Sequence, residues 1–254
     1  MEIIDAILLG FIQGITEFLP ISSSGHLVIG NYFLGIENNN ILFEVFVHLG
    51  TLFAIFYFYK EDIYQLLNGV ISKKKESLNY LFLIAIATIP AIFVGLLFND
   101  QIKNFYDIEW VSTYFIITGV ILFLSNFSSE KTPSINIVFA FIIGLSQAIA
   151  ILPGISRSGI TIGVALLLGI YRKEASKFSF FMAIPIILGA VFFELAMIDS
   201  INSFQIYNLL TGFLTSALIG YFSISLLIKL IDKLHFWKFS IYLWFISILI
   251  NYYV

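Results

Sequence analysis

Arg157 is the side chain whose type and surroundings most clearly predict chemistry. It lies in the segment Pro-Gly-Ile-Ser-Arg-Ser-Gly at 153–159, between two strongly apolar stretches. A guanidinium at membrane depth costs at least about 2.5 kcal/mol and is normally kept for an anionic partner. Ser156 and Ser158 flank this arginine, and Thr161 follows one helical turn later. Because the planar guanidinium fork matches two phosphate oxygens, the segment predicts a phosphate clamp.

A structural ion pair is the alternative explanation for Arg157. Three acidic residues lie in apolar stretches and could neutralise it, namely Glu17, Glu44 and Glu194. The two explanations are compatible, because the ion pair could form while the site is empty. Glu194 lies near a predicted helix end, where extension of its carboxylate to the surface is the simplest account.

A second polar segment lies near the N-terminus. Gln13 and Glu17 are four residues apart and therefore share one face of the first predicted helix. That helix is expected to break at Pro20, and Gly25 and His26 follow a run of three serines, Ser22, Ser23 and Ser24. The free N–H groups and dipole of a helix N-terminus favour phosphate, and histidine can exchange a proton near neutral pH. The segment therefore predicts a second half of an anion site.

Each of these features alone has an ordinary structural explanation. A serine run after a proline can be a helix N-cap, and Glu17 can be a carboxyl that is hydrogen-bonded inside a helix bundle. The joint occurrence of these residues with His26 and Arg157 favours a functional site.

Glu44 and His48 also lie four residues apart and share a helix face. Glu44 could bind a metal ion or influence His26, whereas His48 is expected to be a packed, hydrogen-bonded residue. The carboxylates of Glu17, Glu44 and Glu194 are oxygen donors of the kind that Mg²⁺ or Ca²⁺ prefers.

These residues belong to a chain with the composition of an integral membrane protein. Hydrophobic residues make up 59% of it and charged residues 11%, and its mean hydropathy is +0.98. A membrane-spanning helix needs about 20 apolar residues, and five runs approach or exceed this length: 79–98, 111–127, 178–198, 207–228 and 239–253. The sequence has no cysteine and hence no thiolate metal site. Nucleic-acid binding is not expected, because the 13 basic residues are spread over many short loops.

Breaks in the apolar pattern divide the chain into ten predicted helices. They cover roughly 2–18, 24–35, 41–59, 79–98, 111–127, 137–151, 158–170, 178–197, 207–230 and 239–253. The second and seventh are short for a full span, and each follows one of the polar segments. Such a break with its flanking helices predicts a re-entrant hairpin, which a membrane tolerates where protein or a water-filled cavity surrounds it. The predicted fold is an all-α integral membrane protein with two such hairpins.

The two polar segments also indicate an internal repeat. Gln13, Leu19-Pro20 and Ser22–Gly25 recur in the same order as Gln147, Leu152-Pro153 and Ser156–Gly159. Although such residues recur by chance in helical membrane proteins, the shared order and context favour a duplication. We therefore predict a single membrane domain, 1–254, built from two repeats at about 1–127 and 128–254.

The distribution of basic residues predicts the topology. Let helix 41–59 cross the membrane and each hairpin return to the side that it entered. One side then holds Lys60, Lys73, Lys74, Lys75, Lys131, Arg172, Lys173, Lys177, Lys229, Lys233 and Lys238. The other side holds Lys103 alone, and Arg157 lies at depth. Since basic loops are normally cytoplasmic, both termini are predicted to be extracytoplasmic.

With this topology the two repeats are inverted, and the functional site of such repeats usually lies near the midplane between them. Hairpins that crossed the membrane completely would give the same distribution of charge.

The two polar segments resemble those of a known bacterial family. The matching residues are Gln13 and Glu17 with Pro20–His26, Pro153–Thr161, Phe43-Glu44-Val45 and the helices around Pro90 and Pro185. On these residues the whole chain resembles the undecaprenyl-pyrophosphate phosphatases of the bacitracin-resistance (BacA/UppP) type.

The resemblance implies a ten-helix inverted repeat in the bacterial cell (inner) membrane. It implies hydrolysis of the C55 isoprenyl diphosphate to the monophosphate, which recycles the cell-wall carrier lipid and confers bacitracin resistance. Glu17 and Gln13 fall on the family's acidic motif, Ser23 and His26 on its catalytic serine and histidine, and Arg157 on its phosphate-binding arginine. Gln13 replaces a frequent glutamate, which weakens its case as a metal ligand, and no function is inferred for His48, which stands where glutamine is expected.

We hypothesise a mechanism that uses these residues. A divalent cation, Mg²⁺ or Ca²⁺, held by Glu17 neutralises the diphosphate together with Arg157 and the helix N-termini. Ser23 attacks the terminal phosphorus, His26 shuttles the proton, and the phosphoryl intermediate is hydrolysed. Attack by His26 or by activated water is the alternative. The other expected contacts to the substrate are Gln13, Ser22, Ser24, Ser156, Ser158 and Thr161.

A lipid-phosphate or ion transporter without hydrolysis is the leading alternative function, because inverted repeats commonly support transport. The expected partners are the isoprenoid diphosphate lipid and the membrane, and a homodimer is compatible with the sequence.

Overall fold

The computed structural model describes residues 1–36, 41–103, 105, 108–129, 132, 134–196, 203–230 and 235–253. Most of them form helices: α1 (Ile3–Thr16), α2 (Ser23–Phe33), α3 (Ile41–Phe58), α4 (Lys60–Ile71), α5 (Lys75–Lys103), α6 (Ile108–Leu124), a 3-10 helix (Ser125–Phe127), α7 (Ile137–Ile149), α8 (Arg157–Leu167), α9 (Arg172–Ala196), α10 (Ser203–Leu230) and α11 (Trp237–Tyr253). The predicted all-α fold is confirmed.

The structure contains one helix that the apolar pattern did not predict. The sequence predicts no helix over 60–78. In the structure, α4 occupies Lys60–Ile71 and is bent by 77° from α3. This helix exposes apolar side chains at Tyr64, Leu67 and Ile71 but has charged residues in its first turn. Its pattern is amphipathic and short, so a search for long apolar runs does not find it.

Several helices are long and apolar enough to cross a membrane. Those in the described residues are Lys75–Phe98, Ile108–Phe127, Arg172–Phe193 and Gln205–Lys229, and α3 with α4 would add a bent fifth. Four of the five predicted apolar runs coincide with these spans, although the run 178–198 ends outside the described residues. The remaining run, 239–253, lies in α11, which has 17 residues. The chain is therefore a multi-pass membrane protein.

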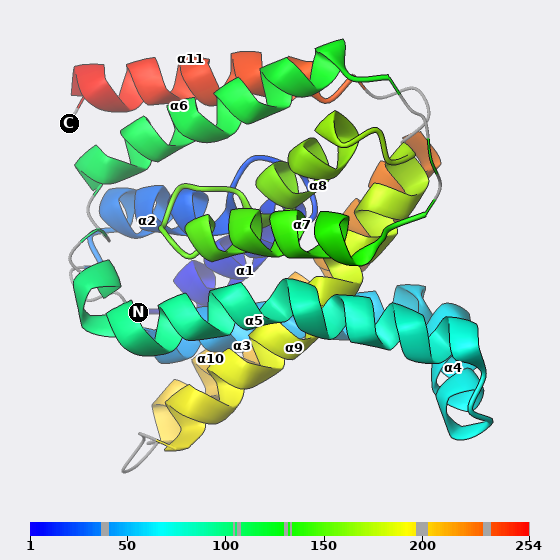
Figure 1. Ribbon diagram of the computed structural model, residues 1–254. Coiled ribbons are helices and arrows are strands. Elements are labelled where there is room, and N and C mark those ends of the chain that lie inside the picture. The colour runs from blue at the N-terminus through cyan, green and yellow to red at the C-terminus, as the bar shows by residue number, and fades with distance from the viewer. Residues whose placement is uncertain are drawn as a thin grey trace.

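Each polar segment lies at the turn of a helical hairpin, as predicted. α1 and α2 have 14 and 11 residues, and α7 and α8 have 13 and 11. At 1.5 Å per residue the longest of them is about 21 Å, shorter than the roughly 30 Å hydrocarbon core. In Figure 1, α2 leads from its turn to the left and α8 leads from its turn to the right, so the two hairpins point in opposite directions.

The two hairpin turns are built in the same way. Ser22 and Ser156 are the N-caps of α2 and α8, and their side chains accept hydrogen bonds from the backbone N–H groups of Gly25 and Gly159 at 3.2 and 3.0 Å. Ser22 has a φ of +70°, in the left-handed region. For a residue other than glycine this backbone costs about 1–3 kcal/mol, and such strain is common at functional sites.

Each hairpin packs against a long helix from the other half of the chain. α1 lies on α10, where Ser223 Oγ donates a hydrogen bond to the Ile15 carbonyl at 2.9 Å. α7 lies on α5, where Gln147 Nε2 donates one to the Ala87 carbonyl at 3.2 Å. α6 and α11 form a third pair along the top of Figure 1. This exchange of partners agrees with the predicted duplication, which stays a prediction.

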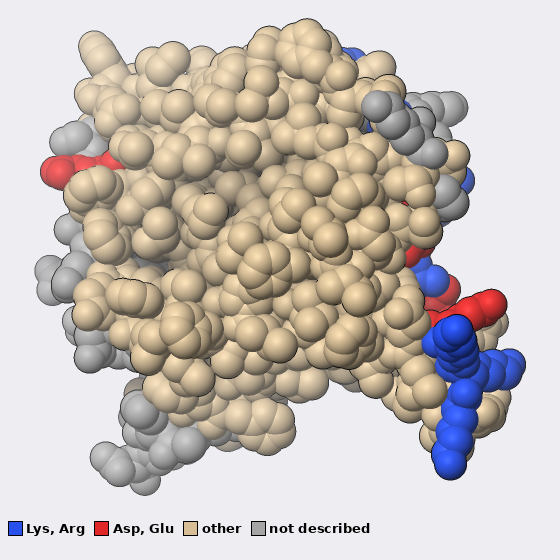
Figure 2. Space-filling model, in the orientation of Figure 1, with Lys and Arg blue, Asp and Glu red and all other residues tan. Residues whose placement is uncertain are grey.

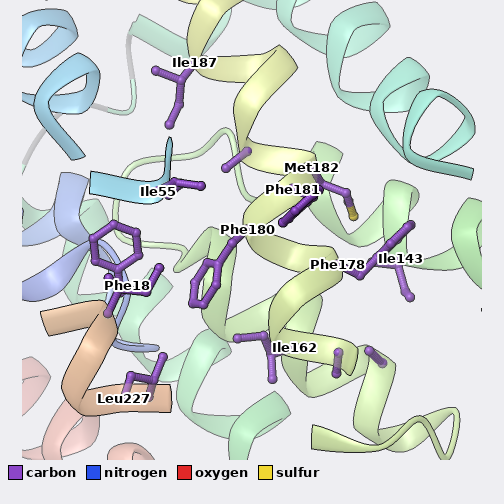
Figure 3. Packing of buried hydrophobic residues seen from close by; sticks show 14 of the residues in the cluster. Phe18, Ile55, Ile143, Ile162, Phe178, Phe180, Phe181, Met182, Ile187 and Leu227 are labelled. Atoms are coloured by element: carbon purple, nitrogen blue, oxygen red, sulfur yellow. The ribbon is translucent and has the colours of Figure 1, made fainter. Parts of the chain in front are cut away.

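The hydrophobic core lies directly beside the hairpin turns. Phe18, which follows α1, contacts Phe180 of α9 edge to face, with ring centroids 5.5 Å apart. Figure 3 shows these two rings with Ile162 of α8 and Ile55 of α3 nearby. Phe18, Phe180, Ile162 and Ile55 are all fully buried. Their sequence neighbours Glu17, Ser179 and Thr161 are therefore attached to a close-packed core, which holds them in place.

The surface has the apolar character of a membrane protein. The visible face in Figure 2 is almost entirely tan, and the blue basic side chains lie along the right-hand margin, most of them over α4. Both chain ends lie on the left in Figure 1, away from α4. Two lysines of the predicted topology, Lys131 and Lys233, lie outside the described residues.

Candidate functional site

The carboxylate of Glu17 is the centre of a buried polar cluster. Glu17 caps the C-terminus of α1 and is 6% exposed. Its Oε1 accepts a hydrogen bond from Arg157 Nη2 at 2.5 Å, and its Oε2 accepts one from Ser23 Oγ at 2.6 Å. Arg157 and Ser23 are the first residues of α8 and α2, the second helices of the two hairpins. The carboxylate therefore connects the two polar segments that the sequence analysis identified.

Two further side chains surround the same carboxylate. Gln13 Nε2 donates a hydrogen bond to Glu17 Oε2 at 3.1 Å, which confirms that they share a helix face. His48 Nε2 of α3 lies 3.6 Å from the same oxygen. The side chains of His48 and Arg157 are 26% and 16% exposed, whereas that of Glu17 is 5% exposed. The surface of the cluster that remains exposed is therefore formed by His48 and Arg157 rather than by Glu17.

Arg157 is held by α9 as well as by Glu17. Its Nη1 donates a hydrogen bond to the Ser179 carbonyl at 3.2 Å. The hydroxyls of Thr161 and Ser179 lie 2.7 Å apart, and Thr161 also donates to the Arg157 carbonyl at 2.7 Å. The hydroxyl of Thr161 therefore links the first turn of α8 to Ser179 of α9, and no described hydrogen bond joins it to the Glu17 carboxylate. The structural ion pair that the sequence left open is present, and it occupies one edge of the guanidinium fork.

The remaining predicted serines connect the hairpins to each other. Ser158 Oγ donates hydrogen bonds to the carbonyls of Glu17 and Leu19 at 3.3 and 3.2 Å. Ser24 Oγ accepts a hydrogen bond from the backbone N–H of Gly154 at 3.4 Å. Ser22 and Ser156, as helix caps, complete the turns. These serines hold the two turns together, and their predicted contacts with a substrate stay a prediction.

His26 does not join the cluster around Glu17. Its Nδ1 hydrogen-bonds to the Ser22 carbonyl at 2.7 Å and its Nε2 to Tyr242 Oη of α11 at 2.8 Å. Both ring nitrogens are therefore occupied, and the hydroxyl proton of Ser23 is directed to Glu17. No described hydrogen bond joins Ser23 to His26, and the proton shuttle by His26 stays a prediction.

The oxygens near Glu17 have the chemistry that a hard cation requires, although they are few. The described residues contain no group of three or more histidine, aspartate or glutamate side chains that could hold a metal ion. Gln13 Oε1 is buried without a hydrogen-bond partner beside Glu17 and Ser23. Mg²⁺ is often held by one or two carboxylates together with substrate phosphates. A cation shared between Glu17 and a bound diphosphate fits this donor set.

No described hydrogen bond or ion pair joins the side chain of Glu44, another candidate acid, to the cluster. Glu44 is 8% exposed, and its Oε1 has no hydrogen-bond partner, so the expected influence on His26 has no described contact behind it. His48, as expected, is hydrogen-bonded within its helix, through Nδ1 to the Glu44 carbonyl at 2.7 Å. Glu194 belongs to the last turns of α9, and its side chain lies outside the described residues.

Sequence reasoning missed three contributors to the site. Ser179 holds Arg157 and Thr161, the hydroxyl of Thr118 accepts a hydrogen bond from the Ser156 N–H at 3.1 Å, and Tyr242 holds His26. Only Ser179 had a signal in the sequence, because it occupies the place in the second repeat that Glu44 has in the first. Thr118 and Tyr242 lie in predominantly apolar helices outside the two polar segments, and only the fold identifies them.

Comparisons with known proteins show matches over almost the whole chain. The family model for the bacitracin resistance protein BacA matches residues 6–249. The chain is similar to the undecaprenyl-diphosphatase of Thermosipho africanus, with 44% identity over 96% of this chain and 97% of the relative. It is 37% identical to that of Methanobrevibacter smithii, over 98% and 97% of the two chains. It is 38% identical to that of Christiangramia forsetii, over 95% and 94%.

Proposed function

The chain belongs to the bacitracin resistance protein BacA family, and from that premise we propose that it hydrolyses undecaprenyl diphosphate to the monophosphate and phosphate. This activity recycles the cell-wall carrier lipid and gives resistance to bacitracin. The observation that carries the proposal is the contact of Glu17 with both Arg157 and Ser23. It brings an anion-binding cation, a carboxylate and a hydroxyl nucleophile to one point inside a membrane protein.

Substrate binding rearranges the ion pair. A diphosphate is a stronger ligand for the guanidinium fork than one carboxylate oxygen, because it offers several charged oxygens to the paired N–H groups. Binding at Arg157 therefore displaces Oε1 of Glu17. The freed Oε1 is then available to a divalent cation, while Oε2 keeps the hydrogen bond from Ser23.

Ser23 then acts as the nucleophile. Its Oγ attacks the terminal phosphorus, its proton passes to Glu17 Oε2, and the bond from that phosphorus to the bridging oxygen breaks, which releases the prenyl monophosphate. Water hydrolyses the phosphoserine in the second step. Glu17 replaces His26 as the first proton acceptor, since it is the group within 2.6 Å of the hydroxyl.

A divalent cation, Mg²⁺ or Ca²⁺, is part of this proposal. Glu17 would hold it, with the Gln13 and Ser23 oxygens nearby, and its chemistry would be to neutralise charge on the phosphate oxygens. Removal of divalent cations should accordingly lower turnover by purified protein.

The decisive measurement is phosphate release from a prenyl diphosphate by the purified, detergent-solubilised protein with Mg²⁺ or Ca²⁺. Replacement of Arg157 by alanine should lower turnover by at least about 100-fold, because it removes the principal charge that stabilises the transferring phosphoryl group. Arg172, the other arginine of the chain, begins α9 and provides the matched control. Arg172→Ala should retain most of the activity, whereas near-normal turnover in Arg157→Ala would refute the clamp.

A transporter of lipid phosphates or ions without hydrolysis is the competing function. Such a protein would release no phosphate in this assay under either cation. Absence of release from wild-type protein that binds the prenyl diphosphate would therefore favour the transporter.

We further infer the orientation in the cell membrane from the basic residues. Lys73, Lys74 and Lys75 follow α4 at the end opposite both termini, as Figure 1 shows. The rule that basic loops face the cytoplasm then places the termini outside. The hairpin of α1 and α2 enters from the extracytoplasmic face, and that of α7 and α8 enters from the cytoplasmic face.

A further inference from the structure

His26 is the predicted catalytic residue that the cluster around Glu17 leaves unexplained. Its ring is half-buried between two aromatic side chains, with Phe115 of α6 at 5.2 Å and Tyr242 of α11 at 5.8 Å between centroids. The plane of the Tyr242 ring is within 7° of the imidazole plane. The described contacts of His26 are thus directed to its own turn and to the pair of α6 and α11.

The two hydrogen bonds of His26 fix its protonation and orientation. The Ser22 carbonyl can only accept, so Nδ1 of the neutral ring carries the proton. Nε2 is then an acceptor, and the hydroxyl of Tyr242 donates to it at 2.8 Å. The tyrosine hydroxyl therefore fills the only remaining polar position of the ring and determines how the ring is turned.

The Ser22 carbonyl connects this arrangement to the nucleophile. Ser22 has the left-handed backbone of the α1–α2 turn and immediately precedes Ser23. A strained conformation persists only where surrounding contacts hold it. The hydrogen bond from His26 Nδ1 is such a contact, and it lies one residue from the hydroxyl that donates to Glu17.

Tyr242 is itself firmly placed, because α11 is fastened to α6 along its length. Trp244 Nε1 donates a hydrogen bond to the Ile116 carbonyl at 3.3 Å, and Ser247 Oγ donates one to the Ser112 carbonyl at 2.8 Å. A hydrogen bond from Ser112 Oγ to Asn251 Oδ1 at 3.1 Å adds a third. Since α11 follows α2 by about 200 residues, the contact transmits the position of a remote helix to the turn.

We propose that Tyr242 is a positioning residue of the phosphatase site. Its hydroxyl holds the His26 ring, which in turn braces the Ser22 carbonyl and the turn that presents Ser23. This inference rests on the proposed function for its catalytic consequence, whereas the contact of tyrosine with histidine stands on the structure alone. Tyr242 lies outside the two polar segments that the sequence analysis identified.

The test uses Tyr242→Phe in the full-length protein in detergent, labelled with ¹⁵N-histidine. The variant keeps the stacked ring and removes only the hydroxyl. The three histidines are His26, His48 and His235, and the resonances of the first are assigned by their loss in His26→Phe. In the wild type, Nδ1 should be protonated and Nε2 should have the shift of a hydrogen-bonded acceptor.

In Tyr242→Phe the Nε2 resonance should move to that of an acceptor without a donor. Turnover should fall by about 3- to 10-fold, the usual contribution of one neutral hydrogen bond, with KM changed by less than about 2-fold. Tyr252→Phe is the matched control, because Tyr252 lies on the same helix and is 79% exposed. It should alter neither the spectrum nor turnover.

The outcomes separate the two ideas. An unchanged Nε2 resonance in Tyr242→Phe would overturn the contact, and a changed resonance with unchanged kcat would overturn the positioning role. If the wild-type protein releases no phosphate, the proposed function is wrong, and so is the positioning role of Tyr242 in catalysis. The spectra still decide in that case whether tyrosine holds the histidine.

Discussion

At the scale of single residues, the site is organised around one carboxylate with competing partners. Glu17 accepts hydrogen bonds from Arg157, Ser23 and Gln13 at 2.5–3.1 Å. Burying a carboxylate and a guanidinium is costly, and removing one partner leaves an uncompensated buried charge. Under the proposed function, a diphosphate would replace Glu17 on the arginine and supply the compensating negative charge.

The nucleophile is testable by trapping the reaction. A prenyl diphosphate labelled in its terminal phosphate should transfer label to Ser23 in acid-quenched wild-type protein, because the attacking Oγ forms the new bond to phosphorus. Ser23→Ala should lose the label and nearly all turnover, and mass spectrometry locates the modified residue.

Ser24→Ala is the control for that experiment, since Ser24 lies next to the nucleophile but hydrogen-bonds to the Gly154 N–H. Label found on His26, or no label under conditions of demonstrated turnover, would contradict attack by serine.

At the scale of helices, the site depends on how closely the two hairpin turns approach each other. Gly25 of α2 faces the backbone of Gly154, so that a methyl group added at 25 would lie 2.9 Å from Gly154 Cα and 2.4 Å from a ring carbon of Phe115. Gly154 has a φ of +97°, a conformation that side chains disfavour. The two glycines therefore allow the turns, and the serines that they carry, to approach this closely.

Gly25→Ala should separate the turns and lower both stability and turnover. Overpacking of this kind costs about 1–3 kcal/mol, which thermal unfolding in detergent would detect as a lower Tm. Gly189 of α9 has no atom within 4 Å of an added methyl group, so Gly189→Ala is the control without a clash. Equal Tm values and turnover for the two variants would show that the close approach is unimportant.

At the scale of the whole molecule, the basic residues and the opposed hairpins define an orientation that can be measured directly. The chain has no cysteine, so single cysteines can be introduced without background. Lys74 is exposed after α4, and Tyr252 is exposed near the C-terminus, on the other side of the molecule. With a membrane-impermeant maleimide, intact cells should label Tyr252→Cys but not Lys74→Cys.

Permeabilised cells should label both variants, which controls for the reactivity of each site. Labelling of Lys74→Cys in intact cells, with Tyr252→Cys protected, would reverse the proposed topology. The outcome also bears on access, because the α1–α2 hairpin that holds Glu17 and Ser23 enters the membrane from the same side as the termini.

The membrane class, the two polar segments and most of the helices could be predicted from the amino-acid sequence. Long apolar runs have one stable solution in lipid, so α5, α6, α9 and α10 followed from composition. The spacing of Gln13 and Glu17 placed them on one helix face, and the cost of an isolated guanidinium marked Arg157. The amphipathic α4 was not predicted, because its apolar side chains are spread along a short helix that also carries charged residues.

The hydrogen-bond partners of these residues could be identified only from the tertiary structure. Arg157 is 140 positions from Glu17, and Tyr242 is 216 from His26, and no local pattern specifies contacts of such separation. These contacts depend on how α8 and α11 pack, and the apolar surfaces that pack them look alike in sequence. Hydrogen bonds in addition require atomic positions accurate to tenths of an ångström. For that reason the sequence identified His26 and predicted that it shuttles the proton of Ser23, whereas the described hydrogen bonds of its ring are to the Ser22 carbonyl and Tyr242 Oη.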